Sequence, residues 1–88
     1  MRTAFRKSVT PDLKKLEDKD ILARVQQVIE EVEAASNLQG IGNLKKMSGT
    51  TNFYRIRIKN YRIGVAAEGD TVEFVRCLAR RDLYRYFP

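Results

Sequence analysis

Side chains that could act on a phosphate are concentrated in residues 54 to 63, where the sequence reads YRIRIKNYRI. Arg55, Arg57 and Lys59 alternate with apolar residues, and Arg62 follows a short polar interruption. Guanidinium groups bind phosphate oxygens through paired hydrogen bonds, and aromatic rings stack on unpaired bases. With the four tyrosines of the chain, this segment favours a surface that binds single-stranded RNA. Exposed arginines on a sheet are also common solubility devices, so the clustering matters more than any single residue.

The net charge of the chain is +6, from 17 Lys and Arg against 11 Asp and Glu, and it is unevenly distributed. Residues 1 to 44 hold seven basic and seven acidic side chains, whereas residues 45 to 88 hold ten basic and four acidic ones. This asymmetry indicates a surface that faces a polyanion. Histidine is absent, which removes the most usual proton shuttle and the commonest zinc ligand. We therefore expect neither a metal ion nor a cofactor, and any catalysis must use other groups.

A chain of 88 residues has room for one modest core, so we expect a single domain over residues 1–88. No apolar run approaches the roughly 18 residues of a membrane span, and the N-terminus lacks the apolar middle of a secretory signal. A cytoplasmic location is expected on these grounds. Cys77 is alone, so it forms no internal disulfide, and we expect it to be a small core residue rather than a nucleophile.

Residues 11 to 35 carry the pattern of a helical hairpin. Thr10 followed by Pro11 predicts the N-cap and the first position of a short helix. Either Asp18 or Asp20 then caps a second helix. Its apolar residues recur at spacings of three and four, which predicts one buried stripe. The stripe comprises Ile21, Leu22, Val25, Val28, Ile29 and Val32.

Beyond Gly42 the apolar period changes to two, which predicts strands. Residues 53 to 59 would carry Phe53 and the cations on one face and apolar side chains on the other. Lys59-Asn60 predicts a two-residue hairpin in which Asn60 accepts a positive φ, and AEGDT predicts a second turn. With RTAFRK as a first strand, these elements predict an α+β fold in which the helical hairpin packs on a four-stranded, mainly antiparallel sheet. The second face of the sheet, which carries the arginines, is expected to be open.

The succession FYRIRIKNYRIGV, an acidic-glycine turn, VEFVRCL and RRDLY resembles the RelE/ParE superfamily of toxins from bacterial type II toxin–antitoxin systems. The resemblance covers nearly the whole chain and implies that the sheet is curved. It also implies one of two functions. RelE-type members cleave messenger RNA on the ribosome by attack of a ribose 2′-OH on the adjacent phosphate, whereas ParE-type members inhibit DNA gyrase without catalysis. We favour the ribonuclease, because phosphate chemistry needs convergent cations; an inactive relative that only binds is a third alternative.

For the ribonuclease branch, the resemblance implies catalytic roles for residues on two strands and just after the last strand. These residues are Arg55, Arg57, Arg62, Arg80 and Tyr84, and Arg81 and Tyr86 are the rival matches for the last two. Further RNA contacts are expected from Lys45, Lys46, Phe53, Lys59, Arg81, Arg85 and Tyr86. The implied partners are messenger RNA, the ribosome and a small cognate antitoxin, with which the chain would form a hetero-oligomer.

Overall fold

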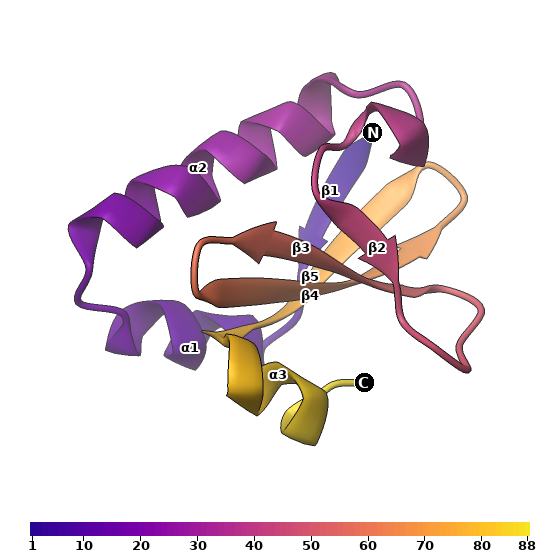
Figure 1. Cartoon of the computed structure of the whole chain (residues 1–88). Helices are drawn as coiled ribbons and strands as arrows, with labels where there is room; N and C mark the ends of the chain where they lie inside the picture. Colours follow the sequence, from indigo (N-terminus) through magenta and orange to yellow (C-terminus); the bar gives the residue numbers. More distant parts are fainter.

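The computed structural model describes all of residues 1–88 and confirms the α+β fold (Figure 1). The helices are α1 (Val9–Lys15), α2 (Lys19–Ala34) and α3 (Arg80–Tyr86), and one 3₁₀ turn spans Leu38–Gly40. The strands are β1 (Arg2–Phe5), β2 (Leu44–Lys46), β3 (Phe53–Ile58), β4 (Tyr61–Glu68) and β5 (Thr71–Ala79). They form one sheet in the order β1-β5-β4-β3-β2, in which β1 runs parallel to β5 and every other pair is antiparallel. None of the helices has the length and apolar character needed to cross a membrane.

The prediction of four strands was wrong, because the sheet has a fifth strand, β2. This strand has only three residues, LKK, and only Leu44 among them is apolar. So short a segment cannot display an alternating pattern, and its strand geometry comes from pairing with β3. In that pairing Lys45 lies opposite Arg55, and Lys46 lies opposite Tyr54.

The apolar stripe of α2 packs on one face of the sheet and forms the main core, as predicted. Asp18 is the N-cap, since its Oδ1 accepts hydrogen bonds from the backbone N–H groups of Asp20 at 2.9 Å and Ile21 at 3.3 Å. From the sheet, Ile56, Ile63, Val65, Val72 and Phe74 complete this core. Cys77 is also part of it, which confirms the structural reading of the lone cysteine.

Helix α1 begins earlier than the sequence predicted, so Thr10 is not its N-cap. The helix starts at Val9, whose side chain is buried in the core and whose N–H donates to the carbonyl of Arg6. The preceding Ser8 occupies the cap position without capping, because its hydroxyl donates instead to the carbonyl of Val75 on β5 at 2.6 Å. Burial of Val9 and the bond to β5 thus outweigh the local Thr-Pro preference.

Asp12 of α1 is buried and ties this helix to the free edge of β5. Its carboxylate accepts two hydrogen bonds from the Arg76 guanidinium, at 2.8 and 3.0 Å, and one from the Cys77 N–H at 3.0 Å. The hydrogen bond to Asp12 raises the pKa of Arg76. Strand β1 pairs with β5 only from Thr71 to Phe74, so Asp12 satisfies a strand donor that would otherwise lack a partner.

The second face of the sheet is not open as expected, because α3 and the C-terminal residues cover part of it (Figure 1). A smaller core forms there from Met47, Val75, Leu83 and Phe87. Val75 faces this core and Phe74 faces the other one, as the alternation of side chains along a strand requires. The register then shifts within β5: Val65 pairs with Phe74 while Gly64 pairs with Arg76, so Val75 is an extra residue. This bulge returns Cys77 to the main core, three residues after Phe74.

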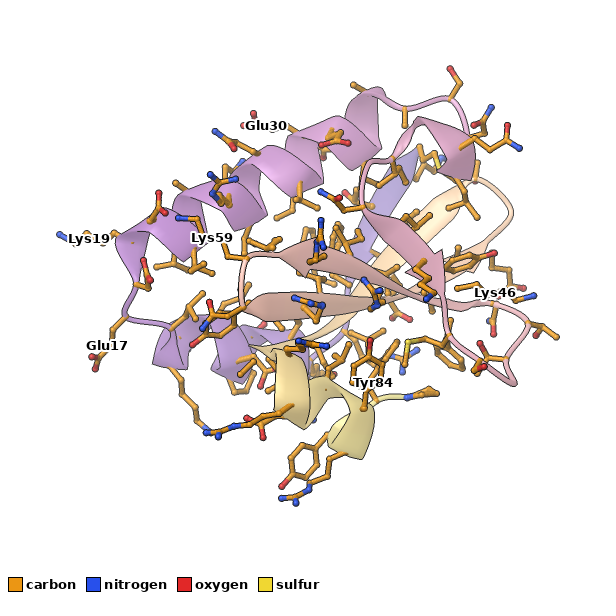
Figure 2. All side chains as sticks on the ribbon, viewed as in Figure 1. Glu17, Lys19, Glu30, Lys46, Lys59 and Tyr84 are labelled. Carbon is orange, nitrogen blue, oxygen red and sulfur yellow. The ribbon has the colours of Figure 1, made fainter.

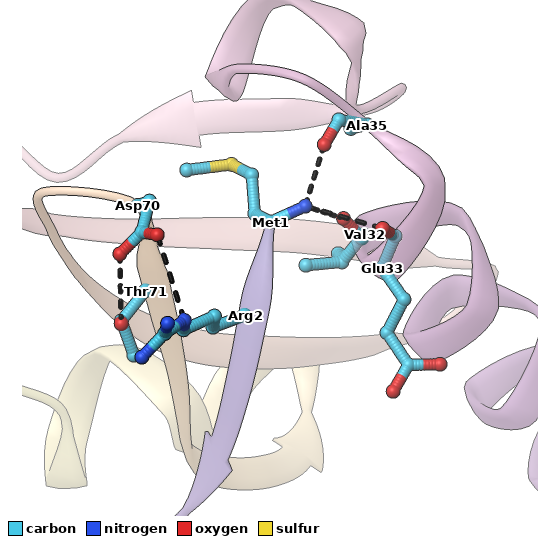
Figure 3. A network of polar contacts seen from close by, with 7 residues as sticks. All are labelled: Met1, Arg2, Val32, Glu33, Ala35, Asp70 and Thr71. Carbon is cyan, nitrogen blue, oxygen red and sulfur yellow. Dashed lines mark hydrogen bonds and ion pairs between the residues drawn. The ribbon is translucent and has the colours of Figure 1, made fainter.

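The start of the chain lies between α2 and the turn that joins β4 to β5 (Figure 3). The Met1 ammonium donates hydrogen bonds to carbonyl oxygens at the end of α2, including those of Val32 at 3.1 Å and Ala35 at 2.5 Å. A positive charge stabilises a helix C-terminus because it opposes the helix dipole. On the other side, the Arg2 N–H donates to the Asp70 carbonyl, and the two side chains form an exposed ion pair. These contacts hold the start of β1 to the end of α2 on one side and to the β4–β5 turn on the other.

Candidate functional site

Arg62 on β4 is the centre of a cationic cluster that also comprises Arg55, Arg57 and Arg80. The sequence predicted an exposed residue, but Arg62 is buried, with 7 % of its surface exposed. Its Nη1 donates to the carbonyl oxygens of Lys59 and Tyr61, each at 2.8 Å. These bonds hold the guanidinium against the β3–β4 turn. The buried Nε has no hydrogen-bond partner, whereas Nη2, also without a protein partner, retains contact with solvent. The Nη2 group of Arg62 is therefore held in place and can donate hydrogen bonds to a ligand.

Positive charges surround Arg62 on several sides. Burial lowers the pKa of its guanidinium, and the charges of Arg55, Arg80 and Arg57 lower that pKa further. The register explains part of this proximity, since Arg57 pairs with Arg62 and Arg55 pairs with the neighbouring Gly64. None of the three surrounding arginines forms an ion pair with a carboxylate. The cluster is thus electrostatically uncompensated, although arginine stays protonated at neutral pH.

Helix α3 brings Arg80 and Tyr84 to this cluster. The backbone N–H of Arg80 donates to the Asn60 carbonyl at 2.8 Å, which fixes the start of the helix at the β3–β4 turn. Residues four positions apart lie on the same side of a helix, so Tyr84 follows Arg80 along one face. Both line a surface depression together with Asn60, Ala79 and Arg81. Tyr84 is 55 % exposed and is also an electrostatic neighbour of Arg62.

Tyr86, the rival of Tyr84, lies elsewhere. Its ring packs over the Arg76 guanidinium at 5.8 Å and lines a different hollow beside α1. Between the two tyrosines, only Tyr84 therefore borders the depression that contains Arg80 and Arg81. Arg85 is exposed on α3 and forms no ion pair.

The other candidate residues divide between the two faces of the sheet. Lys45 pairs with Arg55 and shares the face of the cationic cluster, whereas Lys46 pairs with Tyr54, whose side chain packs against the main core on the opposite face. Phe53 is half-buried and meets the Phe87 ring edge to face at 5.4 Å, which limits its availability to a nucleotide base.

Lys59 occupies the turn itself, with φ of +51°, so the predicted positive φ falls on Lys59 and not on Asn60. Its ammonium forms an ion pair with Asp20 of α2, and Figure 2 shows Lys59 beside that helix. The hydrogen bond from Lys59 lowers the pKa of Asp20. Figure 2 shows Tyr84 apart from Lys59, on α3.

Sequence reasoning missed a second hollow that adjoins Arg62, a groove of about 530 Å³ between α2 and the end of β3. Helix α2 contributes Arg24, Gln27 and Glu31 to its lining, and the loop before β2 contributes Asn43. The sequence places the three α2 residues on the solvated side of an amphipathic helix and Asn43 in a loop, and neither position indicates a site. Only the packing of α2 across the sheet brings them near the cluster.

The cluster can stabilise negative charge on a phosphate, because the charges of Arg55, Arg57 and Arg80 act on the region of Arg62 and have no acidic partners. The Tyr84 hydroxyl can donate or accept a proton, and its ring offers a stacking surface. Such a set suits binding or chemistry on a phosphodiester.

Comparison with known proteins identifies the family of this chain. A family model described as the ParE toxin of the type II toxin–antitoxin system parDE matches residues 4–84. Toxin RelE3 of Methanocaldococcus jannaschii is 40 % identical over 89 residues, which is 100 % of both chains. This chain belongs to the RelE/ParE superfamily of type II toxins.

Solved structures of similar proteins agree with the fold described above. The toxin in a RelB–RelE antitoxin–toxin complex from Methanococcus jannaschii is 40 % identical and superposes with a TM-score of 0.81, covering 97 % of this chain and 99 % of its own. The YoeB dimer from Staphylococcus aureus is 20 % identical, with a TM-score of 0.71 over 89 % of this chain and 94 % of its own, and so supports the fold alone. The similarity to Toxin RelE3 identifies this chain as a RelE-type toxin.

Proposed function

We propose that this RelE-type toxin is an endoribonuclease that cleaves messenger RNA, and that the ribosome holds the message during cleavage. The uncompensated arginine cluster around Arg62 is the observation that supports this proposal. Mutual repulsion of like charges destabilises the free protein, so such a cluster is best explained by an anionic ligand that relieves it. A phosphodiester at the site would do so.

In the proposed reaction the ribose 2′-OH attacks the adjacent phosphorus and the bond to the 5′ oxygen of the next nucleotide breaks. The products are a 2′,3′-cyclic phosphate and a 5′-hydroxyl end. Arg62, Arg55 and Arg57 stabilise the charge on the phosphorane oxygens, with Arg80 on the side of α3. The 2′-OH loses a proton as it attacks, and the departing 5′ oxygen gains one. Arginine seldom exchanges protons, so the Tyr84 hydroxyl is the proton carrier among these groups.

A second candidate function is inhibition of DNA gyrase, and the match to the ParE toxin model favours it. Inhibition by binding does not require a tyrosine beside a convergent arginine cluster. The 40 % identity to Toxin RelE3, together with that cluster, leads us to favour the ribonuclease.

We further propose that a small cognate antitoxin binds this toxin and covers its cationic face. A toxin that is 40 % identical to this chain was solved as a RelB–RelE complex. An acidic partner segment would compensate the arginine cluster and would compete with RNA for it. Co-expression with the product of the adjacent small gene tests this partner; recovery of the toxin alone, still active, would contradict it.

The deciding experiment adds the purified toxin to a translating extract and maps new 5′ ends on the message, with a gyrase supercoiling assay in parallel. We expect internal cuts that leave 5′-hydroxyl ends and no effect on gyrase. Inhibited supercoiling with intact message would instead establish the gyrase alternative.

A further inference from the structure

The groove between α2 and the end of β3 includes Arg62 in its lining and is separate from the depression that Arg80 and Tyr84 line at α3. Strand β2 covers β3 only from Tyr54 to Ile56, so the outer edge of β3 is uncovered from Arg57 onward. The only backbone bond there runs from the Arg57 N–H to the carbonyl of Asn43, at 3.2 Å. The hollow forms at this point because α2 crosses above an edge that no strand fills.

Four lining residues of the groove are cationic, namely Arg24, Arg57, Lys59 and Arg62, against one carboxylate, Glu31. That carboxylate is already used, since its Oε1 accepts a hydrogen bond from the Gly42 N–H at 2.7 Å. Lys59 is also used, in its ion pair with Asp20. Arg24 lies close enough for its charge to contribute to the lowered pKa of Asp20, yet the two form no ion pair.

Apart from Arg62, whose Nη1 donates to two backbone carbonyls, the remaining polar side chains of the groove have no protein partner. The side chains of Arg24, Gln27, Asn43 and Arg57 make no hydrogen bond within the chain, whereas the neighbouring Gln26 donates to Glu30 at 3.2 Å on the outer side of the helix. Two guanidinium forks and two amides therefore converge on one hollow from α2, β3 and the loop before β2. Guanidinium forks match phosphate oxygens, and side-chain amides pair with the edges of unpaired bases.

The groove is also continuous with the proposed site of cleavage. Arg57 and Arg62 line the groove, and both belong to the cluster that includes Arg80 and Tyr84. A strand whose scissile phosphate lies between Arg62 and Tyr84 would thus extend over Arg57 into the groove.

We propose that this groove binds the nucleotide next to the cleaved bond in single-stranded RNA, with Arg24 as a phosphate ligand and Gln27 as a determinant of base preference. The inference rests on the proposed ribonuclease function and assigns it a second subsite. Asn43 completes the recognition of the base from the other wall.

The test measures binding of a short RNA that carries a 2′-deoxy substitution at the cleaved position, and single-turnover cleavage of ribosome-bound message. Arg24→Ala is compared with Lys19→Ala, which removes the same charge from the same helix outside the groove. Gln27→Ala is compared with Gln26→Ala on the outer side. We expect Arg24→Ala to weaken RNA binding roughly tenfold, as for loss of one charge-assisted contact at a partly solvated site. Gln27→Ala should change the base preference beside the cut, and both controls should behave as the parent.

Each result decides the proposal. Cleavage by the parent with Arg24→Ala and Gln27→Ala indistinguishable from their controls would overturn the groove and leave the function intact. Binding of the uncleavable RNA that depends on Arg24 but is accompanied by no cleavage would support the groove and overturn the enzyme. If the parent binds no RNA, or if the two variants weaken only the binding of an antitoxin, the groove is not an RNA site.

Discussion

Arg62 shows how a single side chain in this toxin serves the fold and the site together. Two backbone carbonyls of the β3–β4 turn hold one of its terminal nitrogens, so the guanidinium is already ordered before any ligand arrives. An ordered cation loses little conformational entropy on binding phosphate, which favours a strong contact. The surrounding arginines at Arg55, Arg57 and Arg80 lack carboxylate partners and remain available.

At the residue scale, Arg80→Ala is expected to slow single-turnover cleavage of ribosome-bound message by roughly ten- to more than a hundredfold, because one charge-assisted contact to the transition state is lost.

Tyr84→Phe keeps the ring and removes the hydroxyl. A loss of rate of about a hundredfold or more would support proton transfer by Tyr84, and a near-parental rate would leave base stacking as its role. Tyr86→Phe is the control, since Tyr86 packs on Arg76. Parental rates in every variant would contradict the assignment of Arg80 and Tyr84.

The Cys77 thiol provides a test through pH. Burial, with a smaller contribution from Asp12, raises its pKa from 9.0 to about 11. The folded state therefore holds the proton more tightly than the unfolded state, so the related stability is complete below pH 9 and is lost as the pH rises toward 11. Urea midpoints measured across this range should fall for the parent and fall less steeply for Cys77→Ala. Parallel slopes for the two proteins would contradict a buried, neutral thiol.

At the element scale, α3 reaches the cluster because the chain end is fastened to the sheet. Phe87 is buried against β4 directly over Gly64, where a Cβ atom would lie 2.7 to 2.8 Å from the ring. The absence of a side chain at Gly64 is therefore what allows the close approach, and Arg80 and Tyr84 depend on it through the position of the helix.

Gly64→Ala is expected to displace Phe87, to destabilise the protein by about 1 to 3 kcal/mol and to reduce cleavage. Gly40→Ala is the matched control, because its Cβ would meet nothing closer than 3.4 Å. Thermal melts and the cleavage assay measure both effects. In the double variant with Phe87→Ala the cost of Gly64→Ala should largely disappear; a fully additive loss would mean that the two residues do not oppose each other.

Helix α2 supports the core through its stripe, whereas the cations of β3 contribute little to folding. Val25→Ala is expected to lower the free energy of unfolding by about 1 to 4 kcal/mol, since Val25 is buried and its loss opens a cavity. The free energy of unfolding of Arg55→Ala should stay within about 0.5 kcal/mol of the parent value, whereas its rate of cleavage should fall. Denaturant melts of the two variants decide this. A large loss of stability for Arg55→Ala would make that arginine structural.

For the whole molecule, the positive excess of the second half of the chain is gathered by the fold at the β3–β4 turn and α3. We expect affinity for an uncleavable single-stranded RNA to fall with salt, with a slope of log affinity against log salt of roughly −2 to −3 if three or four phosphates are neutralised. Arg57→Ala should reduce the slope by about 0.7. Lys19→Ala, remote from the cluster, should leave it unchanged. A slope near zero for the parent would exclude phosphate binding as the source of affinity.

The sequence by itself determined much of this protein. Hydrophobic period, a helix cap at Asp18 or Asp20 and two tight turns were enough to predict the α+β fold, the buried stripe of α2 and the alternation that puts Arg55 and Arg57 on one face. These features depend on contacts a few residues apart in sequence, so local patterns report them. The resemblance of the strand and tail motifs then led to the toxin family.

Other features were decided only by tertiary structure, because they depend on residues far apart in the chain. The strand β2 exists through pairing with β3, and α1 starts at Val9 because the core buries it. Arg62 is buried in the folded protein, and the docking of α3 on the sheet decides that Tyr84, and not Tyr86, borders the depression with Arg80. The sequence lists the cations in order, but distances between β3, β4, α2 and α3 determine which of them can meet one phosphate.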